Sequence, residues 1–174
     1  SDERLVNLYF IIRIYQIVWF GGIANYVYRT KHLKDKGNFV DFPLAWFSDD
    51  VTNFIMADEG CCMTQHTAFN VRNSDVNISG QWGNPIDCRK KMIATYMNYD
   101  WMKTYMHRFD CGVDKEFLST IEREYKYKIY TNVQSYIYSC YVKDFLRFLV
   151  KCPNDLGLFK PRMLAHYLRN KIKI

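Results

Sequence analysis

The sequence lacks the short motifs that mark the most familiar nucleotide-binding and hydrolytic sites. It contains no Gly-x-Gly-x-x-Gly, no phosphate-binding P-loop, no Gly-x-Ser-x-Gly and no His-Glu-x-x-His. Each of these motifs performs a specific physical task in its class of protein. The carboxylates also show no pairing that would nominate an acid/base couple. These absences favour a binding protein over an enzyme.

Glycine is scarce, with 8 residues among 174, and the chain has no repeat, no low-complexity tract and no long linker. A chain of this length suits one domain and hydrophobic residues make up 49% of it, so we expect a single helical domain over residues 1–174. Tyr, Phe, Ile, Asn, Lys and Met are plentiful while Ala is scarce. That usage is typical of AT-rich coding DNA and fits a virus or a parasite, and we expect a viral protein that acts on a host protein.

The chain is rich in aromatic side chains and, in its C-terminal part, in positive charge. Tyr, Phe and Trp make up 17% of the residues, and such rings give an interface large contact area at low entropic cost. Residues 1–60 carry six basic and eight acidic side chains, whereas residues 61–174 carry eighteen and ten. We therefore predict a protein partner, with nucleic acid or an anionic surface as the alternative partner of a basic C-terminal face. The predicted contacts of that face are Lys160, Arg162, Arg169, Lys171 and Lys173.

Apolar residues recur at helical spacing over most of the chain. This periodicity predicts a mainly α fold, a bundle of about six or seven helices. The longest apolar stretch, Leu5 to Ala24, contains Arg13 near its middle, so we predict a buried core helix there and not a transmembrane span. Around residues 70–83 the sequence is polar and rich in turn residues, which predicts a loop or a small β-hairpin.

Capping residues and periodicity place the further helices. They are predicted over residues 23–34, 48–56, 61–69, 88–109, 116–130 and 132–151, and from Pro161 onward. Ser48 and Asp87 are predicted N-caps, and Thr131 with Gln134 forms a predicted capping box. The predicted apolar faces are Tyr138, Val142, Phe145 and Leu149 in one helix, and Leu164, Leu168 and Ile172 in the last.

Two pairs of soft metal ligands occur in the chain. Cys62 and His66 are four residues apart, as are His107 and Cys111, so each pair would lie on one face of a helix. Four such ligands suit a tetrahedral structural zinc ion, and zinc is the one cofactor that the sequence suggests. Disulfides and buried free thiols are the alternatives for these cysteines. The six cysteines of the chain are far below the density of a disulfide scaffold.

The stretch around Cys61 and Cys62 also resembles the signature of the secreted phospholipase A2 family, in which two adjacent cysteines precede a catalytic histidine. In that family the histidine lies three residues after the second cysteine and is followed by aspartate. Here His66 lies four residues after Cys62, Thr67 follows it, and no glycine-rich calcium loop precedes Cys61. A lipid hydrolase therefore enters only as an alternative.

A metal-dependent nuclease is a second enzymatic alternative. Residues 124–130 alternate rings and charges with a period of two, and in a strand Glu124, Lys126 and Lys128 would share one face. With Asp87 as a second carboxylate, they would hold a hard cation that activates water. A helix continuing from Glu116 is the other interpretation of the same residues. The leading interpretation remains a non-enzymatic binding module, with a metal-dependent hydrolase and a non-catalytic nucleic-acid-binding protein as alternatives.

Overall fold

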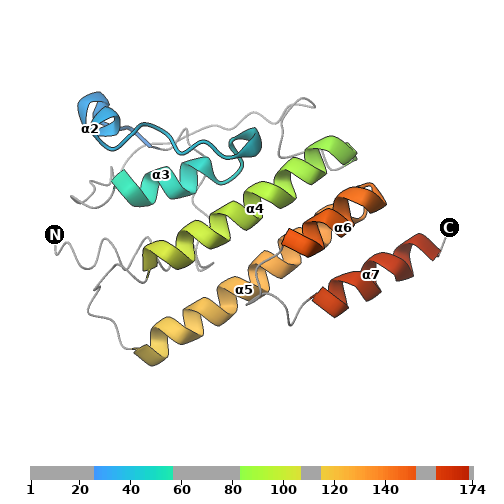
Figure 1. Ribbon diagram of the computed structural model, residues 1–174. Helices are drawn as coiled ribbons and strands as arrows, with labels where there is room; N and C mark the ends of the chain where they lie inside the picture. The colour runs from blue at the N-terminus through green and yellow to red at the C-terminus, as the bar shows by residue number, and fades with distance from the viewer. Residues whose placement is uncertain (1–25, 57–82, 107–114, 152–159, 173–174) are drawn as a thin grey trace, which may run out of the picture.

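The structure is a computed structural model that describes residues 26–56, 83–106, 115–151 and 160–172. These residues form α2 (Thr30–Asp35), the short 3₁₀ helix η2 (Pro43–Ala45), α3 (Ser48–Met56), α4 (Pro85–Met106), α5 (Lys115–Ile137), α6 (Val142–Lys151) and α7 (Lys160–Ile172) (Figure 1). No strand occurs in these four ranges. The prediction of a mainly α bundle is confirmed, while the predicted helices at 5–24 and 61–69 and residues 70–82 of the predicted hairpin lie outside the described residues.

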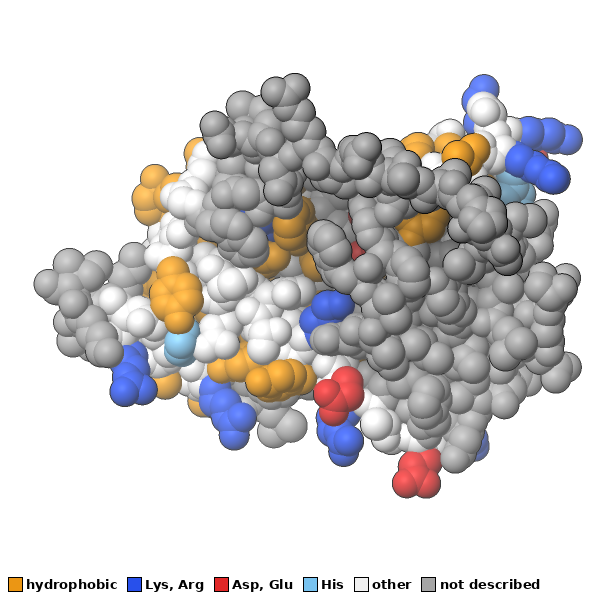
Figure 2. Space-filling view, turned by 180° about the vertical axis from the view of Figure 1, so that it is seen from behind, with side chains coloured by type: hydrophobic (Ala, Val, Ile, Leu, Met, Phe, Trp, Pro, Cys, Tyr) orange, Lys and Arg blue, Asp and Glu red, His pale blue; other side chains and the backbone are white. Residues whose placement is uncertain are grey.

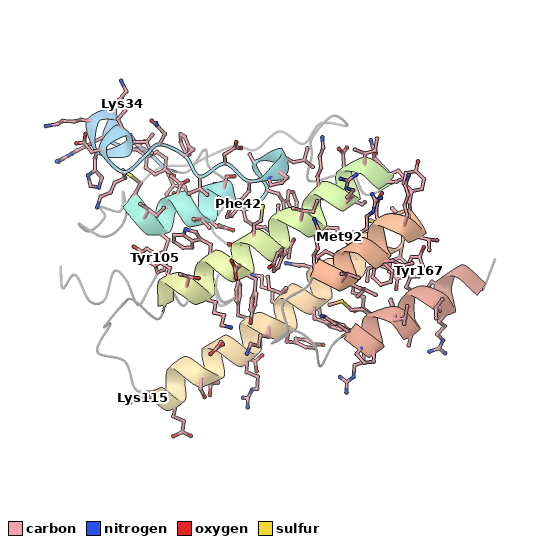
Figure 3. The ribbon with its side chains drawn as sticks, in the orientation of Figure 1. Lys34, Phe42, Met92, Tyr105, Lys115 and Tyr167 are labelled. Carbon is pink, nitrogen blue, oxygen red and sulfur yellow. The ribbon has the colours of Figure 1, made fainter. Side chains whose placement is uncertain are left out.

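The long helix α4 lies between two groups of elements (Figure 1). It contacts η2 on one side and α5 and α6 on the other. Two clusters of buried side chains follow from this position. Ala94 packs with Phe42 and Val51, whereas Met92 and Tyr99 share a cluster with residues of α5, α6 and α7 and with Phe54 of α3. Figure 3 shows Met92 where α4 approaches α5 and α6. α4 is therefore buried along two of its sides.

Rings and a buried amide join α4 to α5. Tyr99 and Tyr125 are stacked with ring centroids 5.9 Å apart. The Asn98 amide donates a hydrogen bond of 2.6 Å to the Tyr125 hydroxyl, which answers the need of a buried tyrosine for a polar partner. Of the described aromatic side chains, eight are buried, six more are partly buried and pack against the buried clusters, and four are exposed. Most of the rings that the chain carries in these ranges therefore build its core.

The start of α4 corrects one predicted cap. The Ile86 N–H donates to the Asn84 side-chain oxygen at 2.9 Å, and the Cys88 N–H donates to the Asn84 carbonyl at the same distance. Asn84 is thus the N-cap, with Pro85 at the first helical position, where its missing N–H costs nothing. The predicted cap at Asp87 is wrong, because that residue lies inside the first turn. There its negative charge interacts favourably with the positive end of the helix dipole.

The predicted helix over residues 132–151 is two helices. α5 continues to Ile137, and α6 begins at Val142 after a turn in which the Ser139 and Cys140 N–H groups donate to carbonyls three residues back. Thr131, predicted to cap this helix, lies inside α5, where its hydroxyl donates to the Lys128 carbonyl at 2.9 Å. The turn directs Cys140 into the core beside Met92, with 3.9 Å between the two sulfur atoms. Burial of that side chain therefore accompanies the break.

The predicted helix over residues 23–34 begins only at Thr30. Tyr26 and Tyr28 precede it in non-helical backbone, and their rings stack with centroids 6.4 Å apart. The Tyr28 hydroxyl donates to the Asn53 side-chain oxygen in α3. A helix would send side chains two residues apart in different directions, so the ring contact and the contact with α3 both require the extended segment.

The segment between α2 and α3 contains left-handed backbone at residues other than glycine. Asn38, Leu44, Ala45 and Phe47 have positive φ, a region that costs an L-residue about 1–2 kcal/mol. Side chains of α3 hold this segment: the Val40 N–H donates to the Thr52 hydroxyl at 3.0 Å and the Phe42 N–H to the Ser48 hydroxyl at 3.1 Å. Ser48 is the first residue of α3, and the Val51 N–H donates to the Phe47 carbonyl at 3.2 Å, so Phe47 stands at the cap position and the predicted N-cap at Ser48 is wrong.

Replacing Ala45 with glycine is expected to raise the free energy of unfolding by about 0.5 kcal/mol. Ala45 is exposed with φ 53°, so glycine relieves about 1 kcal/mol of strain and loses little packing. Urea denaturation measures the change. Ala94→Gly in the buried interior of α4 is the control and is expected to lose about 1 kcal/mol or more. A loss at both positions would contradict the strain at Ala45.

Candidate functional site

The four predicted zinc ligands, Cys62, His66, His107 and Cys111, lie outside the described residues. Within the described ranges, no group of three or more His, Cys, Asp or Glu side chains is arranged to hold a metal ion. The zinc site therefore stays a prediction. Any chemistry of the described residues must be sought in other side chains.

Two of the six cysteines are described, and both are buried free thiols. Burial raises the pKa of the Cys88 thiol, which keeps it protonated and unreactive. Lys91 lies one turn further along α4 with 0% of its side chain exposed, and its Nζ is 4.7 Å from the centre of the Trp46 ring. Burial lowers the pKa of Lys91, against the opposing effects of Cys88 and Asp87. These groups belong to the interior and not to an open site.

The nuclease interpretation depended on a strand at residues 124–130, and the structure has α5 there. On this helix Lys126 pairs with Glu122 at 3.2 Å, while the Arg123 guanidinium lies 3.8 Å from Glu124. Glu124 and Lys126, two residues apart, no longer share a face. The strand interpretation is wrong, and the helix continuing from Glu116 is confirmed.

The predicted basic face begins as expected with Pro161 in the first turn of α7. Arg162 and Arg169 are exposed and Lys160 is half-buried. Lys171 belongs to α7 but its side chain is not among the described ones, and Lys173 lies outside the described residues. The structure thus places four of the five predicted contacts on one helix, and two of them are exposed.

The predicted apolar face of the last helix is corrected by the structure. Leu164 and Leu168, predicted to point inward, are exposed. Met163 and Tyr167, each one residue earlier, are buried in their place. The reason is a partner: the Tyr167 ring stacks on Phe145 of α6 with centroids 4.4 Å apart, and Figure 3 shows Tyr167 directed toward α6. Rotating the helix to bury the leucines would remove this stack.

Helix α6 has three distinct sides. Asp144, Phe145 and Phe148 are buried. Next to them runs an exposed apolar row four residues apart, formed by Val142, Leu146 and Val150, and beyond it an exposed basic row formed by Lys143, Arg147 and Lys151. The exposed fraction reaches 84% at Val150 and is 47% at Leu146. The predicted inward stripe is right for Phe145 and for half-buried Leu149, and wrong for Tyr138 and Val142, which are exposed.

The exposed apolar residues of α6 and α7 lie on the same side of the helix pair. Val142 and Leu146 stand three residues before and one residue after Phe145, and Leu164 and Leu168 stand in the same relation to Tyr167. The two helices run in opposite directions (Figure 1). In such a pair, side chains with the same relation to the stacked rings point to the same side. We call these residues the α6–α7 apolar surface: Val142, Leu146, Val150, Leu164 and Leu168.

Exposed apolar side chains concentrate in this part of the molecule. Eleven large hydrophobic side chains are exposed among the described residues, and seven of them lie between Tyr138 and Leu168. The back view in Figure 2 shows hydrophobic and basic side chains reaching the surface next to one another at the edge where the C-terminal helices lie. The exposed apolar row of α6 was not predicted from the sequence, although its spacing of four residues beside the basic row was the available signal.

No protein-family model, curated protein or solved structure matches this chain. Among the helices of the described ranges, none combines the length and apolar character needed to cross a bilayer. Its function must therefore be inferred from the surface of the protein itself.

Proposed function

We propose that this protein is a non-enzymatic interaction module that binds a protein partner through its C-terminal helices. The observation that supports this proposal is the α6–α7 apolar surface, which is exposed and bordered by basic side chains. Apolar residues scattered singly are ordinary on a protein surface, whereas contiguous apolar residues rimmed by polar ones mark interaction sites. Exposed Tyr141 directly precedes Val142, and tyrosine is a ring type that interfaces favour. The residue usage adds the proposal that the chain is viral and its partner a host protein.

Replacing Leu146 with aspartate is expected to abolish capture of the partner, because a charge would enter the centre of the apolar row without disturbing the core. The measurement is affinity capture with the full chain, followed by mass spectrometry, before and after nuclease treatment. Ile86→Asp is the matched control, since Ile86 is an exposed apolar residue on α4. Thermal melting followed by circular dichroism confirms that both variants stay folded. A set of captured proteins that Leu146→Asp leaves unchanged would contradict the proposal.

A non-catalytic nucleic-acid-binding protein is the second candidate, favoured by the exposed basic row of Lys143, Arg147 and Lys151. Phosphate contacts release counterions, so such binding would fall steeply with added salt. Loss of the captured proteins after nuclease treatment, together with salt-sensitive binding of an oligonucleotide by the purified chain, would favour this candidate over a protein partner.

A further inference from the structure

The chemistry of the α6–α7 apolar surface indicates what kind of partner it fits. We propose that this surface docks an amphipathic helix whose apolar residues are flanked by carboxylates. The proposal rests on the proposed function and deepens it, because it names the class of protein segment that is bound. Its warrant is the combination of an apolar row at helical spacing with basic side chains on the same helices.

The apolar row matches one face of a helix in length and spacing. Val142 and Val150 are eight residues apart on α6, which corresponds to about 12 Å along the helix axis. Leu164 and Leu168 add a second row on the same side of the pair, from α7. A partner helix that carries apolar residues at i, i+3, i+4 and i+7 presents a stripe of this length.

The charge of the two helices defines the flanks of that partner. The sequences of α6 and α7 contain seven Lys or Arg residues and a single carboxylate, Asp144. That carboxylate is buried and forms an ion pair with Arg89 of α4, with 3.8 Å between Nη1 and Oδ1. On α6 each residue of the apolar row is followed directly by a basic residue, the first of which, Lys143, also lies over the Tyr141 ring with 5.9 Å from Nζ to the ring centre. Glu or Asp beside the apolar stripe of a partner would meet these cations at the rim of the contact.

The same features weigh against two other occupants. The exposed apolar row of α6 is one residue wide, with buried residues on one side and cations on the other. A helix that lies in a membrane interface buries a broad apolar face instead. A second copy of the chain would oppose the cations of α6 and α7 to those of another α6 and α7, and like charges across an interface repel.

Two designed helical peptides test the proposal. Each has about 18 residues, or five turns, with the same leucine stripe; one carries Glu and the other Lys at the flanking positions. Fluorescence anisotropy with the full chain at physiological salt is expected to show that the Glu peptide binds about tenfold more tightly, since several rim pairs of modest strength add together. In the variant Lys143→Glu/Arg147→Glu/Lys151→Glu the preference is expected to reverse, while Leu146→Asp weakens both peptides.

Several outcomes would overturn the acidic-helix assignment. Equal affinity for the two peptides would do so, as would an unchanged preference in the charge-reversed variant. Ile86→Asp serves as the control that should bind like the unmodified chain, and circular dichroism verifies the fold of every variant. Binding to vesicles containing phosphatidylserine that the Glu peptide does not displace would assign the surface to a membrane. Self-association that Leu146→Asp abolishes would assign it to a second copy.

The failure of this inference differs from the failure of the proposed function. If Leu146→Asp abolishes capture of a protein but the two peptides bind equally, the interaction module stands and the acidic-helix partner is overturned. If the full chain captures no protein at all, the proposed function fails whatever the peptides do.

Discussion

Replacing Phe145 with alanine is expected to lower the free energy of unfolding by about 3–5 kcal/mol. The Phe145 side chain is fully buried and its ring stacks on Tyr167 with centroids 4.4 Å apart and planes inclined by 28°. Alanine would lose the free energy that the chain gains by transferring the ring from water to the core, and it would leave a cavity between α6 and α7. Urea denaturation followed by circular dichroism gives the change directly.

The control is the next residue on the same helix. Leu146→Ala, at an exposed position, is expected to lose less than about 1 kcal/mol. Phe145→Leu keeps most of the side-chain volume and is expected to lose about 1 kcal/mol, which preserves a measurable variant if Phe145→Ala does not fold. Similar losses for Phe145→Ala and Leu146→Ala would mean that α6 does not bury the side that the structure assigns to it.

Replacing Lys91 with methionine is expected to raise the free energy of unfolding at pH 7 by about 1–3 kcal/mol. The Lys91 side chain is fully buried, and burial lowers its pKa, so the charged form is less favourable in the folded chain than in the unfolded one. The ring of Trp46 compensates for part of that cost. Methionine occupies the same space without a charge, whereas Lys90→Met at the exposed neighbouring position is expected to change little.

The same variant has a signature in the dependence of stability on pH. Since the folded pKa of Lys91 lies below its ordinary value of 10.5, the unfolded chain binds more protons between the two values, and stability rises as pH increases through that window. Lys91→Met removes this contribution, while Lys128, whose pKa is lowered mainly by burial, keeps its own. The comparison belongs below pH 9, because the raised pKa of Cys88, ordinarily 9.0, and the raised pKa of Tyr136, about 12, both lower stability at higher pH. A less stable variant with an unchanged pH slope would contradict the burial of Lys91.

The helical class and several helix bounds could be predicted, because the apolar periodicity and the residues that start or end helices agree at those positions. Residues 48–56 form the predicted helix, and Pro161 lies in the first turn of α7 as expected. Helix breaks were harder to predict. No glycine or proline marks the turn between Ile137 and Val142, and what accompanies it is the burial of Cys140 against Met92, a contact between residues 48 positions apart. A contact between residues so far apart cannot be recognised from the pattern of neighbouring residues in the sequence.

The face of a helix was ambiguous wherever two apolar rows adjoin. In the last helix, Met163 with Tyr167 and Leu164 with Leu168 are both apolar pairs at a spacing of four. Hydrophobicity alone favours the leucine pair, and the Phe145 ring on another helix decides for Met163 and Tyr167. The same ambiguity concealed the candidate site, because Val142 reads equally well as a core residue or as part of an exposed row.

The loop before α3 was unpredictable for a different reason. In a sequence, glycine usually indicates left-handed backbone, yet Leu44, Ala45 and Phe47 adopt this conformation although none of them is glycine. The hydroxyls of Ser48 and Thr52 hold the segment, and a sequence pattern assigns those residues to capping or to the helix surface. The predicted zinc site stays a prediction, since its ligands lie outside the described residues.

The central position of α4 has a consequence for how the protein comes apart. Ala94 is covered by the η2–α3 side and Met92 by the α5–α6 side. If either group of elements unfolded, one buried side of α4 would be exposed to solvent. A truncated fragment that keeps α4 with only half of its neighbours would thus forfeit one of its two cores. We expect the two groups of elements to unfold together in one cooperative transition, because α4 contributes buried side chains to both.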